Sequence, residues 1–278
     1  MEKIRKNKKV IAVFLIPAVL IYLCFELIPV VMSVYFSFND WPGLQAVPLK
    51  FVGFKNYSNL FHNAVFLKSL QNVLIYVVVS VILQVPIGFG LGLLIHHFKK
   101  GQRFFKAAFF IPMILSVTAV ALLWNFIYFP TDKGILNSLL IKIGLGNYIQ
   151  QWLVNPKTSL ICLIVVSTWT SVGYYMIICL AGLTSIPDSV LEAGELDGAT
   201  GWKKIWNLYI PMLWEPLKMS TIMVITGVLK IFDTVYILTP TGGTSNCTIV
   251  PALLMYNEAY RYGHYGTGSA IATVIFVL

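Results

Sequence analysis

The sequence predicts an all-α membrane protein in which residues 1–278 form a single domain, a bundle of six helical spans. Hydrophobic residues make up 58% of the chain and charged residues only 11%, whereas soluble domains carry about 25% charged residues. Five apolar segments are each long enough to cross a hydrocarbon layer of ~30 Å as a helix. Basic residues gather in three of the regions outside these segments, which is typical of cytoplasmic regions.

The basic residues also predict the orientation. Of the 20 Lys and Arg residues, five precede the first apolar segment, four lie within residues 99–106, and Lys203 and Lys204 end an acidic loop. By the positive-inside rule these three regions, and the N-terminus with them, are expected in the cytoplasm. The net charge of +9 is explained by the membrane, so we expect lipid contact and no nucleic-acid partner.

Each of the five complete spans is expected to be one helix, at about residues 10–36, 73–95, 107–128, 159–183 and 217–238. Pro17 and Pro29 predict bends in the first helix rather than breaks. In the second helix, Gly88 and Gly92 have the spacing that lets two helices approach closely. Gln84 in the same helix indicates packing against protein rather than lipid.

The sixth span is expected to begin at Ser269, after a turn over residues 263–268. The apolar run from Ser269 to Leu278 rises only ~15 Å, about half of a bilayer. We therefore expect roughly ten to fifteen further residues to complete this span.

An acidic loop, residues 185–204, joins the fourth and fifth spans and carries Asp188, Glu192, Glu195 and Asp197. Four carboxylates cannot lie in lipid, so the loop is expected at a membrane face, in water or against another protein. Ser185 with Asp188 matches a capping box, which predicts a helix over about residues 186–196. Gly198 suits the left-handed residue that ends a helix, and Thr200 is expected to cap the next one.

The fifth span carries two expected ion pairs, each with a spacing of three residues. Glu215 and Lys218 lie at its inner end, and Lys230 and Asp233 lie in its outer third. Charges paired on one face of a helix reduce the cost of burying them in a membrane.

The acidic loop resembles the EAA loop of ABC importer permeases. Glu192-Ala193-Gly194 is followed after three residues by Gly198 and after nine more by Leu208-Tyr209-Ile210-Pro211. Both spacings agree with the family pattern. The departures are Gly194 in place of the second Ala, and Leu208 and Ile210 exchanged for Ile and Leu.

Two further motifs are similar to those of carbohydrate-type permeases, the maltose/glycerol-3-phosphate class. The first is Phe51-Val52-Gly53 with Asn56-Tyr57, after the first span. The second starts at Phe232-Asp233-Thr234-Val235-Tyr236 and ends at Gly242-Gly243, with one residue inserted before the glycine pair. The resemblance covers nearly the whole chain.

This resemblance implies a type I importer permease that takes up a sugar or oligosaccharide delivered by an extracellular solute-binding protein. It implies a second homologous permease, two ATP-binding subunits that hold ATP and Mg²⁺, and a location in the bacterial plasma (inner) membrane. The chain itself has no glycine-rich phosphate-binding loop that ends in Lys-Ser or Lys-Thr, so we expect it to bind no cofactor and to catalyse no reaction.

Two sets of site residues are expected. The resemblance places the contact with the ATPase subunits, through a coupling helix, at Glu192, Ala193, Gly194, Asp197, Gly198 and Ala199. The solute path is expected among polar and aromatic residues of the spans, because sugar sites combine aromatic faces with hydrogen-bonding groups. These residues are Asn125, Trp169, Tyr174, Tyr175, Lys230 and Asp233.

Other functions stay open at this stage. The acidic loop also fits an importer permease for phosphate, a polyamine or sulfate. A second class is an ion-driven carrier, which often has paired broken helices, or a membrane enzyme. The four His residues are scattered in loops and the four Cys residues lack metal-ligand spacing, so no metal site or catalytic residue is expected. For the aromatic residues within spans, a place in the interfacial belt is the competing explanation.

Overall fold

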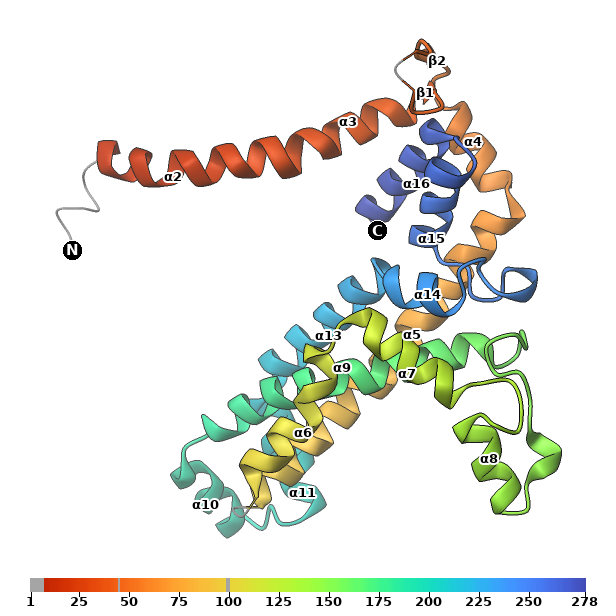
Figure 1. The fold of residues 1–278 in the computed structure, drawn as a ribbon. Coiled ribbons are helices and arrows are strands. Elements are labelled where there is room, and N and C mark those ends of the chain that lie inside the picture. Colours follow the sequence, from red (N-terminus) through yellow and green to blue (C-terminus); the bar gives the residue numbers. More distant parts are fainter. Residues whose placement is uncertain (1–7, 45, 99–100) are drawn as a thin grey trace. The chain divides into compact units, whose positions relative to one another are not determined.

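The structure, a computed structural model, describes residues 8–44, 46–98 and 101–278, with side chains from residue 12 onward (Figure 1). The described chain is mostly helical. It forms two compact units, one of Met1–Leu67 with Leu254–Leu278 and one of Lys68–Leu253.

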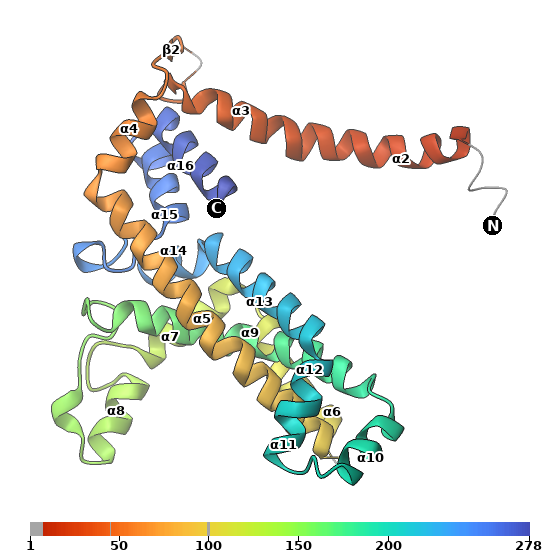
Figure 2. The same ribbon diagram turned by 180° about the vertical axis from the view of Figure 1, so that it is seen from behind.

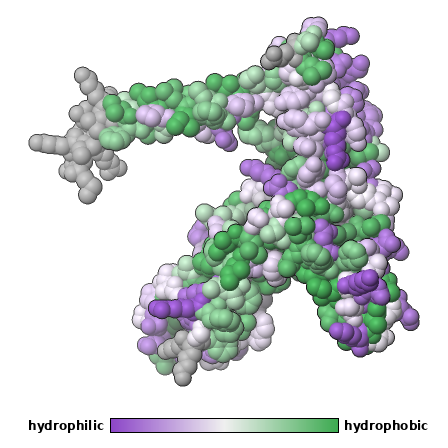
Figure 3. Space-filling model, in the orientation of Figure 1, coloured by the Kyte–Doolittle hydropathy of each residue, from purple (hydrophilic) through white to green (hydrophobic). Residues whose placement is uncertain are grey.

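The first unit contains a long helix built from α2 (Lys8–Tyr22), the π-turn η1 (Leu23–Leu27) and α3 (Ile28–Ser37). The helix continues through Pro17 and Pro29, as expected for bends rather than breaks. From Ala12 to Ser37 its apolar side chains are not buried within the chain, and Figure 3 shows them as a long hydrophobic surface. This surface suits lipid or another protein.

The rest of the first unit closes around the end of α3. It comprises a short antiparallel ladder of β1 (Asn39–Asp40) and β2 (Lys50–Phe51), α4 (Lys55–His62), the end of α15 (Pro251–Tyr256), the π-turn η5 (Asn257–Arg261) and α16 (Tyr265–Val277). Asn56 Nδ2 donates to the Ser37 and Asn39 carbonyls, at 2.8 and 3.0 Å. The Ser37 hydroxyl shares a 2.6 Å hydrogen bond with the Tyr57 hydroxyl. Asn56 and Tyr57 of the first motif therefore fix the end of the first span.

The second unit holds the remaining helices (Figure 2). They are α5 (Ala64–His97), α6 (Gln102–Ile114), α7 (Val117–Ile127), α8 (Ile135–Lys142), η2 (Gly146–Tyr148), α9 (Ser159–Thr184), α10 (Asp188–Leu196), α11 (Trp202–Lys204), η3 (Ile205–Tyr209), α12 (Ile210–Met212), α13 (Trp214–Leu229), α14 (Asp233–Leu238) and η4 (Thr244–Asn246). The first four residues of α5 belong to the first unit, and the first half of α15 belongs to the second.

The core of the second unit is the packing of α5 and α6 on α9. A Cβ placed on Gly88 would lie 2.8 Å from Cβ of Tyr175, and one on Gly92 would lie 3.2 Å from Cβ of Cys179. The predicted close approach at these glycines is thus confirmed, with α9 as the neighbour. A Cβ on Gly173 would collide with the main chain of α6, so α9 presents glycine to α6 as well.

Among the described residues, three helices are long and apolar enough to cross a membrane: Ala12–Ser37, Ala64–His97 and Ser159–Thr184. Two bent helix pairs bring the number to five if each pair counts as one span. The shorter apolar helix α16, which has 13 residues, lies where the sixth span is expected.

The single helix expected for the third span is wrong. α6 and α7 meet at an angle of 98°. Pro112 removes a backbone donor just before the bend. Ser116 then caps a new helix, because its Oγ accepts a hydrogen bond from the amide of Ala119 at 3.3 Å.

The fifth span also differs from its prediction. α13 ends at Leu229 and α14 begins at Asp233, so one helix over residues 217–238 is wrong. The expected pair of Glu215 and Lys218 is present at 2.6 Å. Lys230 and Asp233 lie on either side of the break, and within the described chain they do not come within 4.0 Å of each other as an ion pair.

The turn before α16 is shorter than expected. Gly263 has a φ of +70° and precedes the helix. Gly266 and Gly268 lie inside α16, which begins at Tyr265 rather than at Ser269. A Cβ on Gly268 would lie 2.7 Å from Cβ of Ala259, so this glycine is needed for the packing of α16 against η5.

Candidate functional site

The acidic loop, residues 185–204, is anchored by a buried cluster at its base. Leu183, Ile186 and Leu213 are almost fully buried together. Phe89 and Leu93 of α5 pack against this cluster, as do side chains of α10 and α13. The base of the loop is therefore packed against α5, α9 and α13 together.

The loop helix α10 starts two residues later than the sequence predicts, without the expected capping box. Ser185 Oγ donates back to the Gly182 carbonyl at 2.7 Å, so it does not cap α10. Pro187 takes the cap position with an extended backbone and no side-chain cap bond. The Ser185–Asp188 capping box is therefore wrong, because Ser185 ends α9 instead.

The end of α10 forms as predicted. Gly198 has a φ of +82°, the left-handed conformation that favours glycine. The amide of Gly198 donates to the Glu195 carbonyl at 3.0 Å, and the amide of Ala199 donates to the Gly194 carbonyl at 2.9 Å. This pair of bonds is a Schellman motif. Thr200 does not cap the next helix, because Gly201 lies at that position and no side-chain cap bond forms there.

Two contacts join α10 to the returning chain. Gly194 is buried, and a Cβ placed on it would lie 2.8 Å from Cδ1 of Leu208. Lys204 Nζ pairs with Glu195 Oε1 at 2.6 Å and lies 5.7 Å from the centre of the Tyr209 ring. The hydrogen bond to Glu195 raises the pKa of Lys204 above its ordinary value. Gly194 and Glu195 thus face the chain itself.

The opposite face of α10 is exposed. Glu192, Ala193 and Asp197 point away from the chain's own contacts, as does Leu196, which is 90% exposed. Glu192 and Leu196 are one helical turn apart, so acidic and apolar groups share this surface. We call these four residues the α10 outer face. Sequence reasoning missed Leu196, an exposed apolar residue at the end of an acidic helix.

A cavity of about 230 Å³ opens between the helices of the second unit. Gln84 comes from α5, and Tyr175 with three hydroxyl residues comes from α9. The bend between α6 and α7 and the break between α13 and α14 supply the remaining wall, which includes Thr234. We call this space the polar cavity. The described residues that line it include no Asp, Glu, Lys, Arg or His.

The six residues predicted for the solute path lie in different places. Tyr175 lines the polar cavity. Asn125 lines a second cavity of about 350 Å³ beside the loop that follows α7.

The other four of the six residues are outside these two cavities. Trp169 packs edge-on against Trp124 with ring centres 5.8 Å apart. The Tyr174 hydroxyl lies 3.7 Å from the Met223 sulfur. Lys230 and Asp233 are exposed at the break after α13. The six residues do not form one site.

The polar residues of the cavity wall form a pattern that could have been recognised in the sequence but was not. Ser167, Thr170 and Ser171 line it together with Tyr175. Their spacing of three, one and four residues places them on one face of an otherwise apolar helix. A polar stripe of this kind indicates a helix that faces protein or water. Within the described residues, no group of three or more His, Cys, Asp or Glu side chains could hold a metal ion.

Comparison with known proteins agrees with these features. Residues 84–278 match the family described as the binding-protein-dependent transport system inner membrane component. The chain is 36% identical over 278 residues to the probable ABC transporter permease protein YurN of Bacillus subtilis, covering 99% of this chain and 94% of that protein. It is 32% identical to the lactose transport system permease protein LacF of Rhizobium radiobacter, covering 95% of this chain and 87% of that protein.

A solved structure shares the fold. A bacterial ABC transporter involved in the import of the acidic polysaccharide alginate superposes with a TM-score of 0.83 at 23% identity, over 99% of this chain and 94% of that chain. This likeness confirms the predicted fold class, an all-α permease bundle. With the family match and the relatives of similar length, the chain belongs to the inner-membrane components of binding-protein-dependent ABC transport systems.

Proposed function

We propose that this permease imports a neutral sugar or oligosaccharide, driven by ATP hydrolysis on partner subunits that hold the α10 outer face. The observation that carries the proposal is that one helix, α9, takes part in both the cavity and the base of the acidic loop. This helix lines the polar cavity and contributes to the buried cluster that anchors the acidic loop. Movement of the loop therefore changes the cavity, which is what a transport cycle requires.

The chemistry of the cavity favours an uncharged solute. Its polar groups are hydroxyls, the Gln84 amide and the Tyr175 phenol, which suit the hydroxyl groups and ring faces of sugars. An importer for phosphate or a polyamine needs counter-charges, and the described lining has none. Relatives named for lactose, multiple sugars and alpha-glucosides support the same cargo.

The contact with the ATPase subunits is proposed at Glu192, Ala193, Leu196 and Asp197. A small residue and an exposed leucine allow close apolar contact, and the two carboxylates suit basic groups on the partner. Gly194, Gly198 and Ala199 contribute indirectly, because their backbone contacts set the shape of the loop.

The proposal assigns the remaining roles to other chains and to the membrane. The N-terminus and the acidic loop lie in the cytoplasm, as the basic residues predict. A second permease, two ATP-binding subunits and an extracellular solute-binding protein complete the transporter. ATP and Mg²⁺ bind to the ATPase subunits, and this chain catalyses no reaction.

The test is an assembled complex in liposomes, supplied with its binding protein and with lactose, maltose or raffinose. We expect at least one sugar to stimulate ATP hydrolysis and to enter the vesicles. Leu196→Glu should abolish this coupling, whereas Leu139→Glu on α8, a half-exposed leucine away from the loop, should leave it unchanged. Normal coupling by an assembled Leu196→Glu complex contradicts the contact, and no response to any sugar contradicts the cargo.

A further inference from the structure

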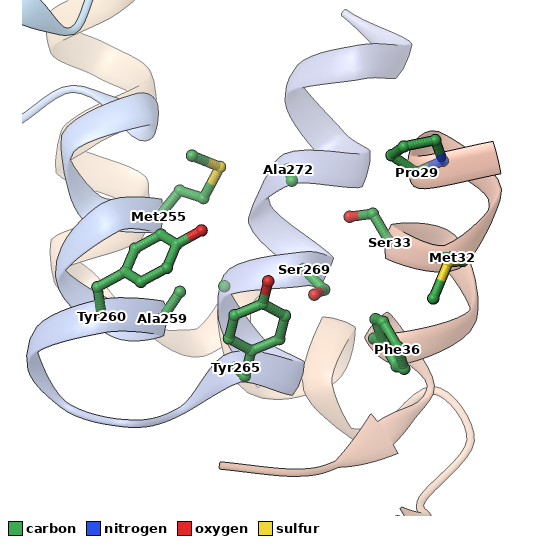
Figure 4. Close-up of a pocket in the computed structure, with 11 residues that line it drawn as sticks. Pro29, Met32, Ser33, Phe36, Met255, Ala259, Tyr260, Tyr265, Ser269 and Ala272 are labelled. Carbon is green, nitrogen blue, oxygen red and sulfur yellow. The ribbon is translucent and has the colours of Figure 1, made fainter. Parts of the chain in front are cut away.

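A separate pocket of about 290 Å³ lies within the first unit (Figure 4). Its walls are α3, the end of α15 with η5, and α16. Because α3 joins the β1 turn and α16 follows the Gly263 turn, the pocket lies at the end of the first span that is opposite the N-terminus. We call it the outer pocket.

Aromatic rings surround the mouth of the outer pocket. Phe36 of α3 lies 4.8 Å from Trp41 and 6.2 Å from Tyr265, measured between ring centres. Tyr265 also contacts Trp41 at 5.3 Å and Tyr260 at 6.0 Å, in both cases edge-on. Edge-on packing holds the rings in place while leaving ring faces available for a ligand.

Hydroxyl groups point into the same space. Figure 4 shows the Ser33 hydroxyl extending from α3 toward α16, and the phenol oxygens of Tyr260 and Tyr265 extending into the gap between the helices. Ser269 supplies a fourth hydroxyl from α16. The lining therefore combines aromatic rings with alcohol groups, and the described residues that form it include no Asp, Glu, Lys, Arg or His.

The hydroxyls of Ser33 and Ser269 differ from other hydroxyls in the spans in their hydrogen bonding. The side chains of Thr170, Ser220 and Thr273 each donate to the backbone carbonyl four residues earlier, at 2.8 to 2.9 Å. Within the described chain, neither Ser33 Oγ nor Ser269 Oγ makes a hydrogen bond of this kind. Hydroxyl groups held among apolar side chains without a partner are available to a polar ligand.

We propose that the outer pocket binds one ring of a neutral sugar before it enters the permease. This inference rests on the proposed sugar cargo. Ring faces and hydroxyls without charges are the groups that recognise a neutral sugar. The volume lies near the lower end of the ~300–1,000 Å³ typical of ligand sites, so it fits a single ring rather than an oligosaccharide. An acyl chain would fill the space but would leave the serine hydroxyls unpaired.

The shape of the pocket depends on a close packing of its walls. Gly268 allows α16 to touch Ala259, since a Cβ there would lie 2.7 Å from the alanine Cβ. Ala259 belongs to the π-turn η5, and such turns are frequent at functional sites. Ala272, one turn after Gly268, lines the pocket with a small side chain. Ala272→Phe is thus expected to fill the pocket.

Binding is tested by protection of an introduced thiol in the assembled transporter. Ser33→Cys is made with Cys24→Ala, because Cys24 is the exposed cysteine and the other three are buried. We expect lactose, maltose or raffinose to slow its reaction with a water-soluble methanethiosulfonate at least fivefold, whereas potassium chloride of equal osmolarity should not. Thr131→Cys in the loop after α7, an exposed position outside the spans, serves as the control and should react at the same rate with and without sugar.

Transport supplies the second measurement. Ser33→Ala and Ser269→Ala each remove one hydrogen-bonding group, so each should raise the KM of sugar uptake about fivefold with little change in maximal rate. Thr226→Ala should change neither value. Ala272→Phe should raise the KM further while the binding protein still stimulates ATP hydrolysis.

The outcomes separate this inference from the proposed function. If a sugar is taken up but does not protect Ser33→Cys, and its uptake does not depend on Ser33 and Ser269, the outer pocket is not a sugar site. The proposed sugar cargo is then unaffected. Protection that depends on lipid and not on sugar assigns the pocket to an acyl chain and overturns the inference. A complex that responds to none of the sugars contradicts the proposed cargo itself.

Discussion

Lys204 Nζ donates to Glu195 Oε1 at 2.6 Å and thereby joins the two arms of the acidic loop. The Lys204 side chain is largely buried, whereas that of Glu195 is half exposed. One of the loop's four carboxylates is therefore bound within the loop itself. This pairing leaves the α10 outer face as the surface available to a partner.

The first prediction concerns this ion pair. Glu195→Gln should speed amide hydrogen exchange over α10 modestly, because partly exposed pairs contribute only ~0.2–1 kcal/mol. Since the pKa of Lys204 is raised in the folded protein, its contribution is fully present below the unfolded pKa of about 10.4 and disappears only as the pH rises through the folded pKa. Exchange corrected for intrinsic rates should therefore be the same at pH 7 and pH 9. Loss of protection by pH 9 would contradict the role of Lys204.

The second prediction concerns Gly194 and Leu208, two residues of the EAA-like motif. A β-branched side chain at Gly194 has no room beside Leu208 Cδ1. Gly194→Val should destabilise the loop by ~1–3 kcal/mol, the usual cost of overpacking. Thermal unfolding of the complex measures this loss. Adding Leu208→Ala should restore part of the stability, and a double variant no better than Gly194→Val would show that the two residues are not coupled.

The third prediction concerns Gly198. Its φ of +82° is unfavourable for side chains, but a Cβ there meets nothing within 4 Å. The cost of substitution is therefore backbone strain rather than collision, ~1–2 kcal/mol for most residues. Gly198→Asn should retain coupled ATP hydrolysis, because asparagine tolerates this conformation. Gly198→Val should reduce it, and equal activities of the two variants would contradict the conformational role.

The fourth prediction concerns the polar cavity. Ser171→Val replaces a hydroxyl by an apolar group of larger volume in the cavity wall, so it should reduce the maximal rate of sugar uptake without preventing assembly. Ser220→Ala provides a control, because Ser220 already donates to its own helix at Pro216 and lines no part of this cavity. Uptake measured in liposomes distinguishes the two. An unchanged rate in Ser171→Val would place the solute path elsewhere.

Helices without interruption were the part of the fold that could be predicted best from the sequence. α9, Ser159–Thr184, lies within one residue of its predicted bounds because its apolar run has no internal break signal. The bend at Ser116 was missed, since an apolar segment with one proline and one serine also fits a straight helix. Lys230 and Asp233 were expected to pair because three-residue spacing brings side chains together only on a continuous helix, and the helix ends between them.

For the site, local backbone chemistry was easier to predict than side-chain grouping. The conformation of Gly198 followed from its type and its place after a helix. The grouping of the solute-path residues did not follow, because Asn125, Tyr175 and Lys230 were expected there only as polar or aromatic residues within spans. Which polar side chains face a common space depends on helix rotation and on breaks that residue type does not specify.

The interruption of α6–α7 and α13–α14 has a consequence for hydration. Where a helix stops within a membrane-crossing segment, peptide groups lose their neighbours one turn away and must find other partners. Leu115 and Ile231, at the two interruptions, both border the polar cavity. The Ile231 amide already donates to the Val228 carbonyl at 3.1 Å, so ordered water is the partner expected for the peptide groups that remain there when no cargo is present. The resting permease is therefore expected to keep water molecules deep inside it, which an arriving solute must displace.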